Sequence, residues 1–203
     1  SADDRVSRVH LRMIKGHYDR SGTRENRAEA EAIVEEVRRR CHDPLCRDQS
    51  LGVVTFNIMQ QNLIDDLVQA ACQQDAALEK WLFDREEALF IKNLENVQGD
   101  ERDVILFSVG YGPDKDGRVS MNFGPLNRDG GWRRLNVAVS RARKGMVVFS
   151  VIRPEQIDLS RTSSDGVEQL RAFLEYAARG RSALAVNAGH TAAHHSTTGH
   201  TAH

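Results

Sequence analysis

The sequence lacks the features of membrane and secreted proteins. No apolar run approaches the length needed to span a bilayer, and no signal-peptide pattern opens the chain. Its three cysteines are an odd number, which argues against a disulfide framework and fits a reducing compartment. Cys41, His42 and Cys46 are spaced loosely like metal ligands, but no fourth ligand lies nearby. We therefore expect a cytoplasmic protein with free thiols, no metal site and no membrane partner.

The sequence is also poor in aromatic residues and in net charge. Aromatic residues make up 6% of the chain and the formal net charge is −1, so no overall field would attract a polyanion. Contact with nucleic acid must therefore come from a local patch. The one concentration of positive charge consists of Arg133, Arg134, Arg141, Arg143 and Lys144, next to Trp132. Because one patch releases few counterions, we expect weak binding from it alone.

The chain is long enough for one sizeable core, and its pattern predicts an α/β fold. Strands are expected at residues 9–14, 51–56, 89–93, 104–109 and 146–152. Helices are expected from Asn26 with Glu29 as a capping-box partner, over residues 63–71, at 131–143 and at 167–179. Residues 110–131 should be irregular. This alternation predicts a mainly parallel sheet with helices on both faces, with ligands bound outside the carboxyl ends of the strands.

Two parts of the chain differ in composition. Residues 1–180 have the composition of one globular domain. Residues 181–203 are rich in alanine, threonine, serine and histidine, including His190 and His203. Such a segment has too few large apolar groups to offset the entropy lost on ordering. We expect it to be a disordered tail or an artificial appendage.

The first segment with chemical potential is residues 135–145, Leu-Asn-Val-Ala-Val-Ser-Arg-Ala-Arg-Lys-Gly. Arg141 stands there at the end of an expected helix, just before a strand. A guanidinium keeps its charge, and its planar fork matches phosphate oxygens, so Arg141 is a candidate arginine finger. The alternative is that Arg141, Arg143 and Lys144 only complement the helix dipole, with Gly145 as the C-cap.

Two further segments carry polar residues beside expected strands. In residues 97–105, Gly99 would let the main chain approach a ligand, and the Glu101 carboxylate could accept from sugar hydroxyls. The alternative there is a surface turn followed by a solvated charge run. Residues 52–61 read Gly-Val-Val-Thr-Phe-Asn-Ile-Met-Gln-Gln and join a strand to a helix. The alternative there is a strand–helix junction with a solvent-facing Gln60.

In sequence order, residues 52–61, 97–105 and 135–145 resemble motifs four, five and six of superfamily-1 helicases. The similarity is to the nonsense-mediated-decay and flap-processing type, which are AAA ATPases, and to their C-terminal RecA-like domain. Residues 18–31, with Asn26 and Glu29, are similar to the lead-in of bacterial members. The resemblance covers about residues 9–179 and implies a P-loop NTPase fold. Phe56 departs from the proline that is common at its position in this family.

The resemblance also implies roles for individual residues. It implies that Arg141 acts on the γ-phosphate of ATP and that Glu101 contacts the ribose. The remaining nucleotide-binding residues that it implies are Gln60, Gln98 and Gly99. It implies contacts to the nucleic-acid strand by Thr55 and Asn96.

The sequence contains no G-x-x-x-x-G-K-[ST] phosphate loop and no apolar strand ending in Asp-Glu that would hold magnesium. In the family that the chain resembles, both belong to the first RecA-like domain. We therefore expect a second motor domain that lacks Walker A and binds neither ATP nor Mg²⁺ tightly by itself. Its expected partners are the N-terminal RecA-like domain of the same parent protein and single-stranded DNA or RNA. The alternatives are a non-catalytic RecA-like interaction module and a stand-alone nucleic-acid-binding domain.

Overall fold

The centre of the molecule is a five-stranded parallel sheet. The computed structural model describes residues 8–193, and side chains up to residue 180. The sheet order is β1-β5-β4-β2-β3, and every neighbouring pair is parallel. The strands are β1 (Val9–Met13), β2 (Leu51–Thr55), β3 (Phe90–Asn93), β4 (Arg102–Ser108) and β5 (Ala142–Ser150). This architecture confirms the predicted α/β fold and is that of a RecA-like, P-loop type domain.

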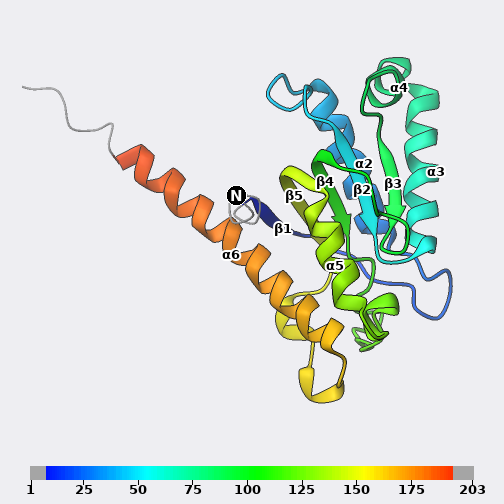
Figure 1. Ribbon diagram of the computed structural model, residues 1–203, viewed down its shortest axis with the longest axis vertical. Helices are drawn as coiled ribbons and strands as arrows, with labels where there is room; N and C mark the ends of the chain where they lie inside the picture. The colour runs from blue at the N-terminus through cyan, green and yellow to red at the C-terminus, as the bar shows by residue number, and fades with distance from the viewer. Residues whose placement is uncertain (1–7, 194–203) are drawn as a thin grey trace, which may run out of the picture.

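Helices cover both faces of the sheet (Figure 1). One face packs against α2 (Arg27–His42), α3 (Ile58–Gln74) and α4 (Ala76–Phe83), around a cluster that includes Ile33, Val53 and Leu106. The other packs against α5 (Gly131–Ser140) and α6 (Asp165–Ala193), around a cluster that includes Phe107 and Leu174. Short 3-10 helices lie at Gly124–Asn127, Pro154–Gln156 and Leu159–Arg161. Because both faces are covered, all five residues of β2 are buried.

Side-chain caps fix the starts of α2 and α3. Asn26 Oδ1 accepts from the backbone N–H of Glu29 at 3.1 Å, which confirms the predicted start of α2. Asn57 Oδ1 accepts from the N–H of Gln60 at 2.8 Å and caps α3 in the same way. The helix predicted over residues 63–71 lies within α3, where Leu63, Ile64, Val68 and Ala71 are buried and Leu67 is half-buried. Helix α4 was not predicted.

The boundary between α5 and β5 differs from the prediction. Helix α5 ends at Ser140 rather than residue 143, and β5 already begins at Ala142. The cause is long-range pairing, because Ala142 pairs with Arg102 of β4 and the Arg102 N–H donates to the Arg141 carbonyl at 3.0 Å. Gly145 therefore lies inside β5 and is not the helix C-cap. Arg141 itself occupies the C-cap position.

The backbone of helix α6 lies directly against the backbone of the core at two glycines. A Cβ added to Gly166 would lie 1.9 Å from the carbonyl oxygen of Leu126, and one on Gly180 would lie 2.4 Å from that of Val9. Only glycine permits these backbone approaches. The helix continues to Ala193, past its predicted end at residue 179 and into the segment expected to be disordered (Figure 1). The rest of that predicted tail, residues 194–203, lies outside the described residues.

The described residues bear on three expectations from composition, which concern membrane-spanning helices, the cysteines and a metal site. Over residues 8–193 no helix combines the length and apolarity needed to cross a bilayer. Cys41 and Cys72 are buried, Cys46 is half-buried, and all three are free. Within that stretch no three or more histidine, cysteine, aspartate or glutamate side chains gather in a way that would hold a metal ion.

Candidate functional site

The candidate residues lie at two opposite edges of the sheet. Thr55 ends β2 and Asn96 follows β3, so both are at the carboxyl edge. Glu101 precedes β4 and Arg141 precedes β5, so both are at the amino edge. The expectation that ligand-binding groups gather at the carboxyl ends is therefore wrong for Glu101 and Arg141. The physical reason is that Arg141 stands at a helix-to-strand junction, whereas the carboxyl edge holds strand-to-helix junctions.

Arg141 has a guanidinium that the protein leaves largely unsatisfied. The residue is half-buried, and the only hydrogen bond that its guanidinium makes among the described residues runs from Nη2 to Ser140 Oγ at 3.1 Å. Its Nε is buried without a hydrogen-bond partner. In the described part of the chain, no carboxylate oxygen lies within 4.0 Å of this guanidinium. A buried donor without a partner destabilises the protein, so the Arg141 guanidinium is suited to bind an anionic ligand.

The neighbouring cations on β5 are neutralised. Arg143 forms ion pairs with Glu87 and, at 3.1 Å, with Asp103. The hydrogen bond from Arg143 lowers the pKa of Glu87 to about 2. Lys144 also lies near Asp103, at 4.0 Å. These two cations therefore hold the amino ends of the strands together and leave little positive charge for a ligand.

The cations on α5 are partly occupied as well. Arg134 lies 3.9 Å from Glu95, although its Nη1 has no hydrogen-bond partner. The Arg133 guanidinium lies over the ring of Trp132, 5.3 Å from its centroid, and the Trp132 side chain is partly exposed. The concentration of charge seen in the sequence is therefore not one continuous basic patch.

The loop between β3 and β4 contains the first part of the second candidate segment, residues 97–101, and ends at the amino edge of the sheet, where Arg141 also lies. Gln98 is exposed, and Gly99 has a left-handed φ of 91° with open space around it. Asp100 has a lowered pKa, first because Lys92 hydrogen-bonds it and then because the charges of Arg102 and Arg141 lie nearby. The Arg102–Arg141 backbone bond places the main chain of Glu101 close to that of Arg141. The structure thus brings the end of this loop and the Arg141 backbone to the same edge of the sheet.

The Glu101 carboxylate is available for a ligand. Its side chain is half-buried, and no donor among the described residues is hydrogen-bonded to it. Asn96 is exposed at the opposite edge, but its Oδ1 accepts from the N–H of Asn93 at 2.8 Å and so closes the turn after β3. Its amide nitrogen remains exposed to a ligand at that edge.

Gln60 and Thr55 are turned into the protein. Gln60 is fully buried, and its amide both accepts from Asn26 N and donates to Asn26 O at 2.8 Å, with a further bond to Ser108 Oγ at 3.2 Å. Thr55 is also fully buried, and its hydroxyl donates to the Asn57 carbonyl at 2.7 Å. The structure therefore does not present either side chain to a ligand, contrary to the predicted contacts with nucleotide and strand.

Sequence reasoning missed the group at the centre of this buried network, the Glu29 carboxylate. Its Oε1 accepts from Ser108 Oγ at 2.8 Å and from Gly110 N at 2.9 Å. Its Oε2 accepts from Asn26 Nδ2 at 2.7 Å and from Val151 N at 3.2 Å. Burial raises the pKa of Glu29 to about 8, although these hydrogen bonds oppose the rise. The Asn26–Glu29 spacing was the signal, but it indicated a helix cap only.

Comparison with known proteins agrees with this architecture. Residues 5–152 match a family model described as an AAA domain. The chain is 36% identical over 181 residues to "Uncharacterized ATP-dependent helicase MG140" of Mycoplasma genitalium, covering 87% of this chain and 15% of that protein. It is 39% identical over 134 residues to the homolog of Mycoplasma pneumoniae, covering 63% of this chain and 11% of that protein. The chain thus spans 15% or less of these curated relatives. From the match over most of its length, the chain belongs to the AAA domain family.

Proposed function

We propose that the chain is the second motor domain of an ATP-dependent superfamily-1 helicase of the nonsense-mediated-decay and flap-processing type. In this function, Arg141 is the arginine finger and Glu101 contacts the nucleotide ribose. The observation that carries the proposal is the guanidinium of Arg141, which has a buried Nε without a partner and no carboxylate within 4.0 Å in the described chain. The two relatives, both named as ATP-dependent helicases, support the same function.

The residues at the amino edge fit one part of ATP. A cationic fork that is already desolvated can stabilise negative charge on a transferring phosphoryl group, and it needs little reorganisation to do so. Glu101 can accept from sugar hydroxyls, and Gly99 lets the main chain approach the ligand. ATP supplies the phosphoryl group that is transferred to water. Residues 8–193 hold no cluster of acidic side chains that would bind Mg²⁺, so the metal and the phosphate loop must come from the partner domain.

The separation of the two edges fits a motor domain. A nucleotide at the amino edge and a nucleic-acid strand at the carboxyl edge would lie on opposite sides of one rigid parallel sheet. Movement of the sheet relative to a partner domain would then couple the two ligands. Asn96 and the start of α3 are the exposed polar groups that the carboxyl edge offers to the strand.

The test is the rate of ATP hydrolysis by the complete protein that contains this chain, with and without single-stranded DNA or RNA. Arg141→Ala should lower the stimulated kcat by roughly 10³-fold, which is typical of an arginine finger. The matched control is Arg133→Ala, which removes an arginine from the preceding helix α5 and should change kcat by less than about twofold. The chain alone should hydrolyse no ATP.

The results also separate the alternatives. A non-catalytic interaction module predicts that Arg141→Ala leaves the rate of the complete protein unchanged, which would refute the proposal. A stand-alone nucleic-acid-binding domain predicts tight, salt-sensitive binding by this chain without its partner domain. Thermal unfolding of each variant, compared with the unchanged protein, shows whether a loss of rate reflects a loss of folding.

A further inference from the structure

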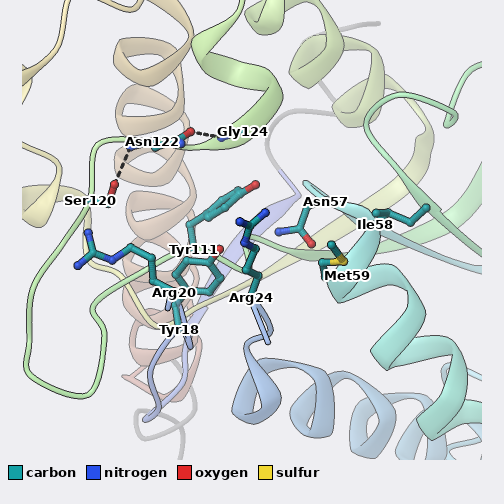
Figure 2. Close-up of a pocket in the computed structure, with 10 residues that line it drawn as sticks. All are labelled: Tyr18, Arg20, Arg24, Asn57, Ile58, Met59, Tyr111, Ser120, Asn122 and Gly124. Atoms are coloured by element: carbon teal, nitrogen blue, oxygen red, sulfur yellow. Dashed lines mark hydrogen bonds between the residues drawn. The ribbon is translucent and has the colours of Figure 1, made fainter. Parts of the chain in front are cut away.

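A cavity of about 360 Å³ opens at the carboxyl edge of the sheet, away from Arg141 and Glu101. Its walls come from three segments that are distant in the sequence: residues 18–24 after β1, residues 57–59 at the start of α3, and residues 111–124 after β4 (Figure 2). Its volume is within the range of small-molecule sites. None of the residues lining it was singled out in the sequence as binding a ligand.

The cavity has a cationic lining. Its two charged residues are Arg20 and Arg24, and no acidic side chain lines it. Arg20 is paired with Asp114 at 3.3 Å, whereas Arg24 has no ion pair within 4.0 Å among the described residues. The nearby Asp19 carboxylate accepts instead from the backbone and hydroxyl of Thr23 at 2.9 and 3.0 Å. In Figure 2 the Arg24 guanidinium points between Tyr111 and Asn57.

The opposite wall adds neutral donors. Helix α3 begins there, and none of the described residues accepts from the N–H groups of Ile58 and Met59, which belong to its first turn. A helix of 17 residues also carries partial positive charge at this end. The Tyr111 side chain hydrogen-bonds Asn57, and burial raises its pKa, so its hydroxyl stays protonated. The cavity thus offers an anion one free guanidinium and two backbone N–H groups.

Apolar surface lies next to these donors. Ile58 and Met59, which are adjacent at the start of α3, are 54% and 41% exposed. Deeper in the wall, the rings of Tyr18 and Tyr111 pack edge to face with centroids 5.3 Å apart. A ligand that matches this surface has an anionic group and a flat, weakly polar part. A phosphorylated nucleotide unit has both.

We propose that this cavity binds one phosphate-bearing nucleotide unit of the single strand, separately from the ATP site. The phosphate lies against Arg24 and the N-terminus of α3, and the base lies on Met59 and Ile58. The inference rests on the proposed function in taking a nucleic-acid strand as the ligand. The phosphate can belong to the interior of the strand or to its phosphorylated end, and the chemistry of the site is the same for both.

The test is equilibrium binding of a fluorescent oligothymidylate of about ten nucleotides to the complete protein without ATP, measured by anisotropy at low salt. One oligonucleotide carries a 5′-phosphate and the other does not. Arg24→Ala should weaken binding about tenfold, because it removes a charge-assisted contact. The control, Arg118→Ala, removes an exposed arginine of the same 111–124 excursion that does not line the cavity, and should change binding less than about twofold.

A second variant tests the cavity itself. Ser120→Trp fills the space without changing the charge, and it should weaken binding as much as Arg24→Ala does. A loss confined to the phosphorylated oligonucleotide assigns the site to a strand end, and an equal loss for both assigns it to the strand interior. Equal losses for Arg24→Ala and Arg118→Ala, or no loss for either cavity variant, would overturn the proposal. Because ATP is absent, the outcome is independent of the Arg141 test, so the two proposals can fail separately.

Discussion

The amino and carboxyl edges of the sheet use similar polar residues in opposite ways. At the carboxyl edge, Glu29 and Gln60 are fully buried, and their side chains form hydrogen bonds with neighbouring groups of the protein. At the amino edge, Glu101 and Arg141 are half-buried and make few bonds with the protein. The comparison teaches that a polar residue in a helicase-like motif acts as scaffold where the protein meets its hydrogen-bonding needs. It is available for a ligand where the protein does not.

The largest effect that would sharpen this comparison concerns the pH dependence of stability. The pKa of Glu29 is about 8 in the folded protein and ordinarily 4.5. The folded state therefore binds the Glu29 proton more tightly than the unfolded state does. The stabilisation that results is complete below pH 4.5 and is lost as pH rises towards 8. The slope should reach roughly 1.4 kcal/mol per pH unit. In Glu29→Gln this slope should disappear from urea unfolding curves measured between about pH 5 and 8.

The Glu29→Gln protein should also be the less stable one at pH 5, since both oxygens of the protonated carboxyl group can accept hydrogen bonds and the amide nitrogen that replaces one of them cannot. The difference between the two proteins should narrow as pH rises. A constant difference across this range would show that Glu29 does not titrate as the buried network requires.

A smaller effect separates two glutamines at the two edges. Gln60→Ala leaves the buried N–H of Asn26 without a partner and removes one of the two hydrogen bonds that the Asn26 carbonyl accepts, so it should lower the free energy of unfolding by about 3 kcal/mol. Gln98→Ala, in the exposed loop, should change it by less than about 0.5 kcal/mol. Urea unfolding at constant pH measures both. Similar losses for the two variants would break the distinction between scaffold and ligand-binding residues.

The smallest effect tests the opposite pKa shift at the amino edge. Glu87 has a pKa of about 2 because Arg143 hydrogen-bonds it, so its contribution is present above its ordinary value of 4.5 and is lost as pH falls towards 2. Both side chains are about one-third exposed, so solvent screening limits the contribution to about 1 kcal/mol. Glu87→Gln should therefore destabilise the protein at pH 7 but hardly at pH 2.

Glu86→Gln, at the exposed neighbouring position, is the matched control for this pair. It should leave the unfolding free energy at pH 7 unchanged, because no cation is paired with Glu86 in the described chain. Equal effects of the two substitutions would show that the Arg143 pair contributes nothing specific.

Much of the fold could be predicted because its signals are local. Apolar, β-branched runs such as residues 51–55 identify buried strands, and Asn26 identifies a helix start. The end of α5 could not be predicted, because residues 142–145 take their conformation from pairing with Arg102, about forty residues earlier. Local sequence favours a continued helix there, and the sheet overrides it.

The site was predicted in part for a related reason. The resemblance of the segments indicated Glu101 and Arg141, and the structure places both at the amino edge of the sheet, where the backbones of Arg102 and Arg141 are hydrogen-bonded. Whether Gln60 and Thr55 face a ligand depends on burial, which arises only when the strand ends close around them. The cavity beside Arg24 is formed by three distant segments, so no single stretch of sequence reveals it.

The two glycine contacts of α6 have a mechanical consequence. Gly166 and Gly180 fasten the helix backbone against the carbonyl groups of Leu126 and Val9, at points roughly 21 Å apart along the helix axis. A rod clamped at two such points cannot slide or roll against the sheet without a backbone collision. A force on its distal end would therefore be transmitted to β1, an edge strand of the sheet.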